Sequence, residues 1–144
     1  MSSEADPSPA LPSDKELVLR VVPMPADANA NGDIFGGWVM AQIDIAGAVL
    51  PSRLARGRLV TVAVNQVVFE QPVHVGDLLS FYAEVIRVGN TSITVAVEVY
   101  AQRLQHSEKA IQVTEAEVTY VAIDEHGSPR RVINTPVINA MDRA

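Results

Sequence analysis

The spacing of apolar and polar positions changes along the chain, and each change marks a different predicted element. An alternating run at 17–22 predicts a short strand, which ends before Pro23 because proline cannot donate to a sheet. Residues 38–50 are apolar at nearly every position, which is typical of a buried helix. We expect Pro51 to bend or end this helix, with a brief continuation to Ala55. Beyond it the period is two, and strands are predicted at 59–69, 78–88, 92–104 and 111–123.

The strand predicted at 92–104 has the clearest alternation of the four. Its apolar side carries five residues of one parity: Ile93, Val95, Val97, Val99 and Ala101. The other side is more polar, as expected for a sheet with one face on a core. In the last strand the apolar positions change parity near Glu115, which indicates a β-bulge. Four strands joined by short turns predict an antiparallel meander over the single apolar helix, and the predicted fold class is therefore α+β.

The composition indicates one aliphatic core. Of the 144 residues, 48% are hydrophobic and only 5% aromatic, so aliphatic side chains must fill the interior. We divide the chain into a flexible N-terminal tail at 1–14, one domain at 15–131 and a C-terminal tail at 132–144. The first tail is rich in Ser, Pro and acidic residues, and it lacks the basic start and apolar run of a signal peptide.

Charge and residue usage argue against several classes of function. Eleven basic and seventeen acidic residues give a net charge of −6, which disfavours nucleic-acid binding. The absence of cysteine excludes disulfides, thiolate nucleophiles and iron–sulfur ligation, and we expect a cytoplasmic location. The three histidines lie far apart, and no pair has the spacing of a zinc motif. No run reaches the roughly 18–20 apolar residues of a membrane span. The longest candidate, 38–50, contains Asp44.

Asp44 is the residue that fits its surroundings least. A carboxylate in an apolar helix is costly to bury, and burial would raise its pKa towards the range of a general base. Alternatively, Asp44 emerges at a subunit surface or caps a neighbouring amide. The pair Gly36-Gly37 leaves free amides at the helix start, which can bind an oxyanion or simply form a tight packing corner. Asn29 and Asn31 can orient a water or a carbonyl, or hold turns.

The run from Asp27 to Asp44, DANANGDIFGGWVMAQID, resembles the signature of hotdog-fold acyl-CoA thioesterases, most closely the small bacterial YciA-type enzymes. The likeness continues in four shorter segments, at 57–64, 72–77, 88–92 and 121–124. Together they span most of the chain, from residue 16 to residue 131. The hotdog fold is an antiparallel sheet wrapped around one long central helix, and it agrees with the order of elements predicted above.

The resemblance implies an enzyme that hydrolyses acyl-CoA to a free carboxylic acid and CoA. CoA is then part of the substrate and a product, and no cofactor or metal is expected. Such enzymes form homodimers that join two sheets into one, often with three dimers in a hexamer. Their active site lies between protomers. From the net charge and the short apolar runs, we expect neither a nucleic-acid partner nor a membrane span.

By this resemblance Asp44 is the catalytic carboxylate, either as general base on a water or as nucleophile. Asn29, from across the dimer interface, positions the water or the carbonyl, and an amide at Gly37 stabilises the oxyanion. The expected substrate-binding residues are Phe35, Gly36, Trp38, Arg58, Thr61, Gly89, Asn90, Thr91, Ser92, Arg103 and Arg130. Their arginines, with Arg131, are candidates for the CoA phosphates because guanidinium groups bind phosphate through paired hydrogen bonds. Each arginine can equally be a solvated surface charge.

Two positions depart from the family pattern. Pro51 stands where relatives continue an ordinary helix, and Gln102-Arg103 stands where members often carry two lysines. A hotdog hydratase is disfavoured because no histidine lies between Asn29 and Asp44. A non-catalytic acyl-CoA-sensing module is the main alternative, although such regulators usually carry a DNA-binding segment. If the protein were a purely structural oligomer, the presence of Asp44 in an apolar helix would have no explanation.

Overall fold

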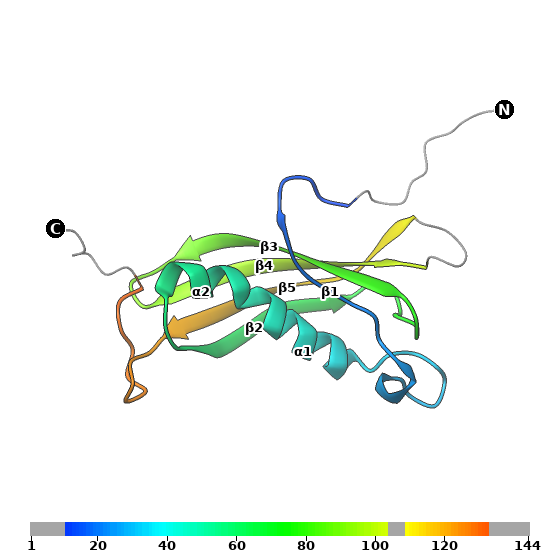
Figure 1. Cartoon of the computed structure of the whole chain (residues 1–144), viewed down its shortest axis with the longest axis horizontal. Helices are drawn as coiled ribbons and strands as arrows, with labels where there is room; N and C mark the ends of the chain where they lie inside the picture. Colours follow the sequence, from blue (N-terminus) through cyan, green and yellow to red (C-terminus); the bar gives the residue numbers. More distant parts are fainter. Residues whose placement is uncertain (1–10, 104–108, 133–144) are drawn as a thin grey trace.

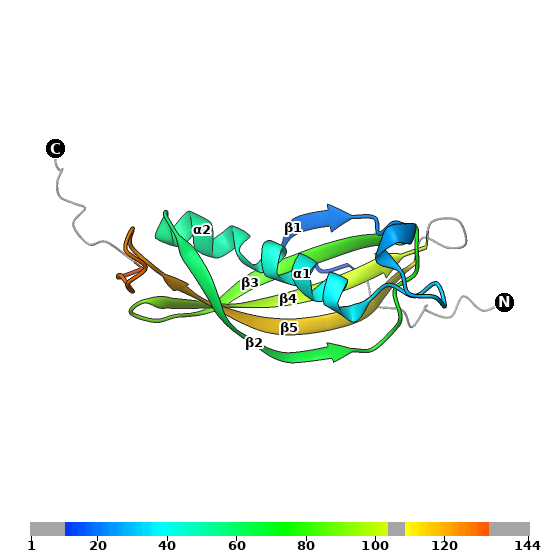
Figure 2. The ribbon, with the colours of Figure 1, turned by 90° about the horizontal axis from the view of Figure 1, so that it is seen from below.

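Figures 1 and 2 show the computed structural model, which describes residues 11–103 and 109–132. A sheet curves around one long helical segment, which lies on its concave side. The elements in chain order are β1 (Glu16–Val21), the 3-10 helix η1 (Pro25–Asp27), α1 (Gly36–Gly47), α2 (Val49–Ala55), β2 (Leu59–Phe69), β3 (Leu78–Val88), β4 (Ser92–Gln102) and β5 (Ala110–Ala122). Most of the two predicted tails, and Leu104 at the predicted end of β4, lie outside the described residues.

The strand order is β1-β3-β4-β5-β2, and every neighbouring pair is antiparallel. The predicted four-strand meander is therefore wrong for β2, which lies at the far edge beside β5 (Figure 2). The connection at 70–77 is long enough to carry the chain past the ends of β5 and β4. It is held at the start of α1, where the Ile34 N–H donates to the Val73 carbonyl at 2.8 Å. A period of two predicts strands but not which strands are neighbours.

The core lies between the sheet and one side of the helices. On β4 the five apolar residues of one parity are fully buried, which confirms the predicted alternation. Val39, Ile43 and Ala46 of α1 belong to the same hydrophobic cluster, at the spacing of one helical face. The expectation that this helix is buried all round is wrong, because the sheet covers it from one side only. Met40 is exposed, and Ile45 has 58% of its surface exposed.

The helical segment is divided at Ala48 into α1 and α2. Pro51 explains the break, because it has no N–H to donate to the Gly47 carbonyl and its ring crowds that carbonyl. The helix therefore breaks three residues before the proline, and its predicted continuation to Ala55 is confirmed. Arg56 ends α2 with a φ of 49°.

The parity change predicted near Glu115 is confirmed as an irregularity in β5. The register between β4 and β5 shifts between Gln112 and Thr114, so that Val113 has no partner on β4. Opposite the same stretch, β2 shifts its register as well. Because of the extra residue, Val113 and Ala116 both lie in the core although three positions separate them.

Candidate active site

The side chain of Asp44 meets the edge strand β2. Thr61 donates from Oγ1 to the Asp44 carboxylate oxygen Oδ1 at 2.7 Å. The carboxylate is half-buried and hydrogen-bonded, which lies between the two alternatives of a buried aspartate and one that emerges at the surface. The reason is that β2 is an edge strand and leaves one side of α1 open. Within the described residues, Oδ2 makes no hydrogen bond, and it is the oxygen available to accept a proton.

The main chain of Asp44 is held as well, by Tyr120 of β5. The Tyr120 hydroxyl donates to the Asp44 main-chain carbonyl at 2.7 Å. This carbonyl is available because the Ala48 amide, its partner in an unbroken helix, turns to the carbonyl of Ile45. Burial, and after it the charge of Asp44, raises the pKa of Tyr120, so the hydroxyl remains a donor at neutral pH. Thr61 and Tyr120 are register partners, so two neighbouring strands fix Asp44.

Gly47 leaves the space that the tyrosine contact needs. A Cβ at this position would lie 2.5 Å from the Tyr120 hydroxyl oxygen. Neither residue stands out in the sequence as part of the site. A glycine inside an apolar helix is the one available signal, since it often marks close packing. Nothing local connects Tyr120 with Asp44, because 76 positions separate them.

A groove of about 310 Å³ lies beside Asp44, between the helices and β2. Asp44, Ala48 and Ser52 follow one another at four-residue spacing on one helical face, and Gly57 continues the wall beyond α2. The groove therefore runs along the helix, away from the start of α1. Its other lining residues combine apolar groups with hydroxyls: Ile45, Leu59, Thr61 and Tyr120. Such a surface suits an extended ligand with both apolar and polar parts.

The start of α1 presents unpaired amides. No side chain caps this helix end. Gly36 and Gly37 are exposed, and in the described part of the chain their amides have no acceptor. A Cβ added to Gly37 would meet open space, whereas at Gly36 it would touch the Phe69 ring at 3.4 Å. The side of Gly37 is therefore open to an anionic group.

A second hollow, of about 260 Å³, lies between the start of α1 and the end of β2. Phe69 and Val39 form part of its apolar lining. Of the expected substrate-binding residues at this end, Trp38 packs partly against the core, while Phe35 is exposed. The apolar surface near Gly37 is thus divided between the hollow and the open face of the helix.

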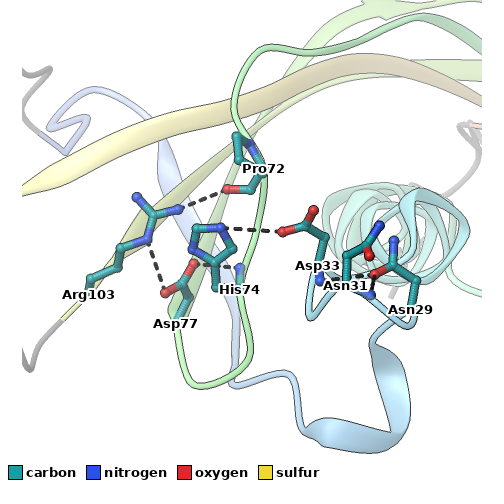
Figure 3. A network of polar contacts seen from close by, with 7 residues as sticks. All are labelled: Asn29, Asn31, Asp33, Pro72, His74, Asp77 and Arg103. Atoms are coloured by element: carbon teal, nitrogen blue, oxygen red, sulfur yellow. Dashed lines mark hydrogen bonds and ion pairs between the residues drawn. The ribbon is translucent and has the colours of Figure 1, made fainter.

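Asn29 lies in the loop before α1 and uses its side chain to shape that loop (Figure 3). Its Oδ1 accepts the main-chain amides of Asn31 at 2.8 Å and Asp33 at 3.1 Å. The outward end of the side chain is therefore the NH₂ group, which can only donate. Asp44 lies eight residues beyond Gly36, about 12 Å along the helix. One chain alone therefore does not bring Asn29 to Asp44.

Residues 89–92, which the family resemblance predicts to bind CoA, form a turn at the end of the sheet beside α2, far from the start of α1 (Figure 1). The Gly89 N–H closes the turn by donating to the Ser92 carbonyl at 2.7 Å. The carbonyls of Asn90 and Thr91 accept main-chain amides from the chain near the end of β5. Arg58 is exposed at the same end, and within the described residues its guanidinium hydrogen bonds are two long ones of 3.4 Å, to the carbonyls of Asp124 and Glu125.

Arg130 and Arg103 are both bound to main-chain carbonyls. Arg130 donates from Nε to the Ile123 carbonyl at 2.9 Å and from Nη1 to the Ala55 carbonyl at 3.0 Å. It thereby joins the end of α2 to the end of β5. Arg103 follows β4 at the opposite end of the sheet, where Nη2 donates to the Pro72 carbonyl at 2.9 Å. Since a strand rises about 3.3 Å per residue, roughly 35 Å separate Arg103 from the turn at 89–92.

Residues 11–103 and 109–132 contain no group of three or more His, Asp or Glu side chains that could hold a metal ion. No helix in these ranges is long and apolar enough to cross a membrane.

Residues 31–108 match the model of the thioesterase superfamily. The chain belongs to this superfamily. It is 49% identical over 117 residues to the acyl-CoA thioester hydrolase YciA of Salmonella typhimurium, over 80% of this chain and 88% of that protein. The hexameric thioesterase y2039 from Yersinia pestis is 47% identical, with a TM-score of 0.80 over 84% of this chain and 98% of that one. For Cj0915, a hexameric hotdog-fold thioesterase of Campylobacter jejuni, the identity is also 47% and the TM-score 0.76, over 81% and 89%.

These likenesses confirm the hotdog fold and the family resemblance that the sequence motifs indicate. Within one chain, the predicted site residues lie in three separate regions along the helical segment. Asp44 and Thr61 meet at the middle of the helical segment. Asn29 and Gly37 lie at its start, and the turn at 89–92 lies at its far end.

Proposed function

We propose that the protein hydrolyses acyl-CoA thioesters to a carboxylic acid and CoA. The observation that carries the proposal is the Asp44 carboxylate, held by Thr61 beside a partly apolar groove. The acyl-CoA substrate is supported by the 49% identity to a hydrolase of acyl-CoA thioesters. The groove leads from Asp44 towards the end of the sheet where Arg58 is exposed, which suits a long substrate with a phosphate-bearing end.

In the proposed reaction, Oδ2 of Asp44 takes a proton from a water while the water oxygen adds to the thioester carbonyl carbon. The carbonyl oxygen becomes an oxyanion, which the Gly37 amide and the Asn29 side-chain N–H groups stabilise. The C–S bond then breaks, the CoA thiolate leaves, and Asp44 returns the proton to it. One water is consumed, and no cofactor takes part.

A covalent route uses the same residues. Asp44 attacks the carbonyl carbon itself and expels the thiolate, and water then opens the acyl-aspartyl anhydride. A single turnover in heavy-oxygen water distinguishes the two routes. The general-base route, which we favour, leaves Asp44 unlabelled, whereas anhydride hydrolysis at the aspartyl carbonyl puts the label into Asp44.

We propose that the complete site forms between two copies of the chain, with Asn29 and Gly37 of one copy facing Asp44 and Thr61 of the other. Asn29 and Asp44 are far apart within one chain, which supports this arrangement. The open side of the helix and the edge strand β2 expose apolar residues, among them Ile45, Val62 and Val64. Because two similar proteins are hexameric, we propose a trimer of such dimers for this chain.

We further propose that CoA is bound near the turn at 89–92, with Arg58 as the arginine best placed for a phosphate because it is exposed and weakly engaged. Arg130 and Arg103 already donate to carbonyls, and a phosphate would have to compete with those bonds. A cytoplasmic location, where acyl-CoA is available, remains part of this proposal.

The test is CoA release from a panel of esters from butyryl- to palmitoyl-CoA, with added aryl and branched thioesters. A thiol reagent reports the product without background, because the protein has no cysteine. Wild type should turn over part of the panel, and Asp44→Ala should lose about 10²–10⁴-fold in kcat while keeping its fold. Release of CoA at the wild-type rate by Asp44→Ala would remove the assignment of the base. A folded wild-type oligomer that binds CoA esters without cleaving them would instead indicate a sensing module.

A further inference from the structure

The connection between β2 and β3 is clamped at both ends by two side chains. Asp77 is buried, with only 3% of its surface exposed. Its Oδ2 accepts the His74 amide at 2.9 Å, and its Oδ1 lies 3.3 Å from Nε of Arg103. Arg103 also donates from Nη2 to the Pro72 carbonyl. The segment 72–77 is therefore a fixed platform, tied to the end of β4 (Figure 3).

This platform supports the loop that carries Asn29. The Val73 carbonyl accepts the Ile34 amide at 2.8 Å, and residues 33 and 74 form an isolated antiparallel bridge. Beyond these main-chain bonds, Nε2 of His74 lies 3.4 Å from Oδ1 of Asp33. Asp33 in turn donates its amide to Oδ1 of Asn29 and accepts the Asn29 amide at its carbonyl, at 2.7 Å. The His74 imidazole thus directly contacts Asp33, the residue whose amide helps to orient the Asn29 side chain.

We propose that His74 is a positioning residue, which acts through Asp33 to hold the Asn29 NH₂ group towards the substrate carbonyl. This inference rests on the proposed function. The side chains of His74 and Asp33 are 47% and 45% exposed, so their contact adds little to stability. The contact instead fixes the position of the Asn29 NH₂ group, because a small displacement of a catalytic donor lowers the reaction rate even when the fold is intact.

The experiment compares kcat, KM and thermal midpoint for five variants with an acyl-CoA that the wild type hydrolyses. His74→Ala should lower kcat by about ten- to a hundredfold with KM unchanged and the midpoint lowered by at most about 4 °C. His74→Gln should recover most of the loss, since its Nε2 can donate from nearly the same place. His126→Ala is the matched control. Its imidazole lies 3.5 Å from Glu125, is 80% exposed and is far from Asn29, so kcat should stay at the wild-type value.

The double variant Asn29→Ala/His74→Ala shows whether His74 acts through Asn29. Once the Asn29 side chain is gone, removal of His74 should cost nothing further, so the double variant should equal Asn29→Ala. Independent, multiplicative losses would overturn the proposal, and so would normal kcat in His74→Ala beside a defective Asn29→Ala. A wild type that releases no CoA from any ester would overturn the proposed function together with this role for His74.

Discussion

At the scale of single residues, the loop before α1 fixes which end of the Asn29 side chain faces outward. Its oxygen is engaged by two main-chain amides, so only N–H groups remain for a ligand. This geometry favours contact with the thioester carbonyl over acceptance of a proton from water.

Replacement of Asn29 by aspartate tests this role. Aspartate keeps the oxygen that accepts the amides of Asn31 and Asp33, but it replaces the outward donor by a second acceptor. We expect an unchanged thermal midpoint and a loss of about 10²–10³-fold in kcat, as for the removal of an oxyanion donor. Steady-state kinetics and thermal unfolding together check this. A kcat near that of the wild type would mean that Asn29 only shapes its loop.

Gly47 tests the clamp on Asp44. In Gly47→Ala the new methyl group would meet the Tyr120 hydroxyl, so we expect a loss of about 1–3 kcal/mol in the free energy of unfolding. The double variant Gly47→Ala/Tyr120→Phe removes the hydroxyl and with it the clash. If the contact is the cause, chemical denaturation should find the double variant more stable than Gly47→Ala alone. A less stable double variant would contradict this account.

At the scale of elements, the local period of the sequence predicts the strands and the helix, and the structure confirms most of their bounds. The order of strands was not predictable, since β2 differs from a meander strand only in its neighbour. The resemblance names Thr61 as a site residue, but its contact with Asp44 was not predictable, and Tyr120 was missed altogether, because both contacts depend on how β2 and β5 pair. The sequence motif at 27–44 singles out Asp44, but the residues that bind Asp44 follow from the order of strands in the sheet.

Arg130 and Arg58 lie close together near the end of α2, but their surroundings differ. Arg130 donates to carbonyls of α2 and β5, whereas Arg58 is exposed. Arg130→Gln should therefore lose about 2 kcal/mol of stability, seen as a lower thermal midpoint. Arg58→Gln should keep the midpoint and raise KM for acyl-CoA several-fold. A raised KM in Arg130→Gln without loss of stability would reverse the two assignments.

At the scale of the whole molecule, the separation of Asn29 from Asp44 predicts that two inactive chains can complement each other. In a twofold dimer with shared sites, a chain lacking Asn29 still supplies Asp44, and a chain lacking Asp44 still supplies Asn29. Random mixing of equal amounts of Asn29→Ala and Asp44→Ala chains makes half of the dimers mixed, and each mixed dimer has one intact site of two. Coexpression or co-refolding should therefore restore about a quarter of the wild-type activity. The matched control mixes Asn29→Ala with a chain carrying both substitutions, which can form no intact site. Equal, negligible activity in both mixtures, with mixed oligomers shown by mass spectrometry, would place the whole site within one chain.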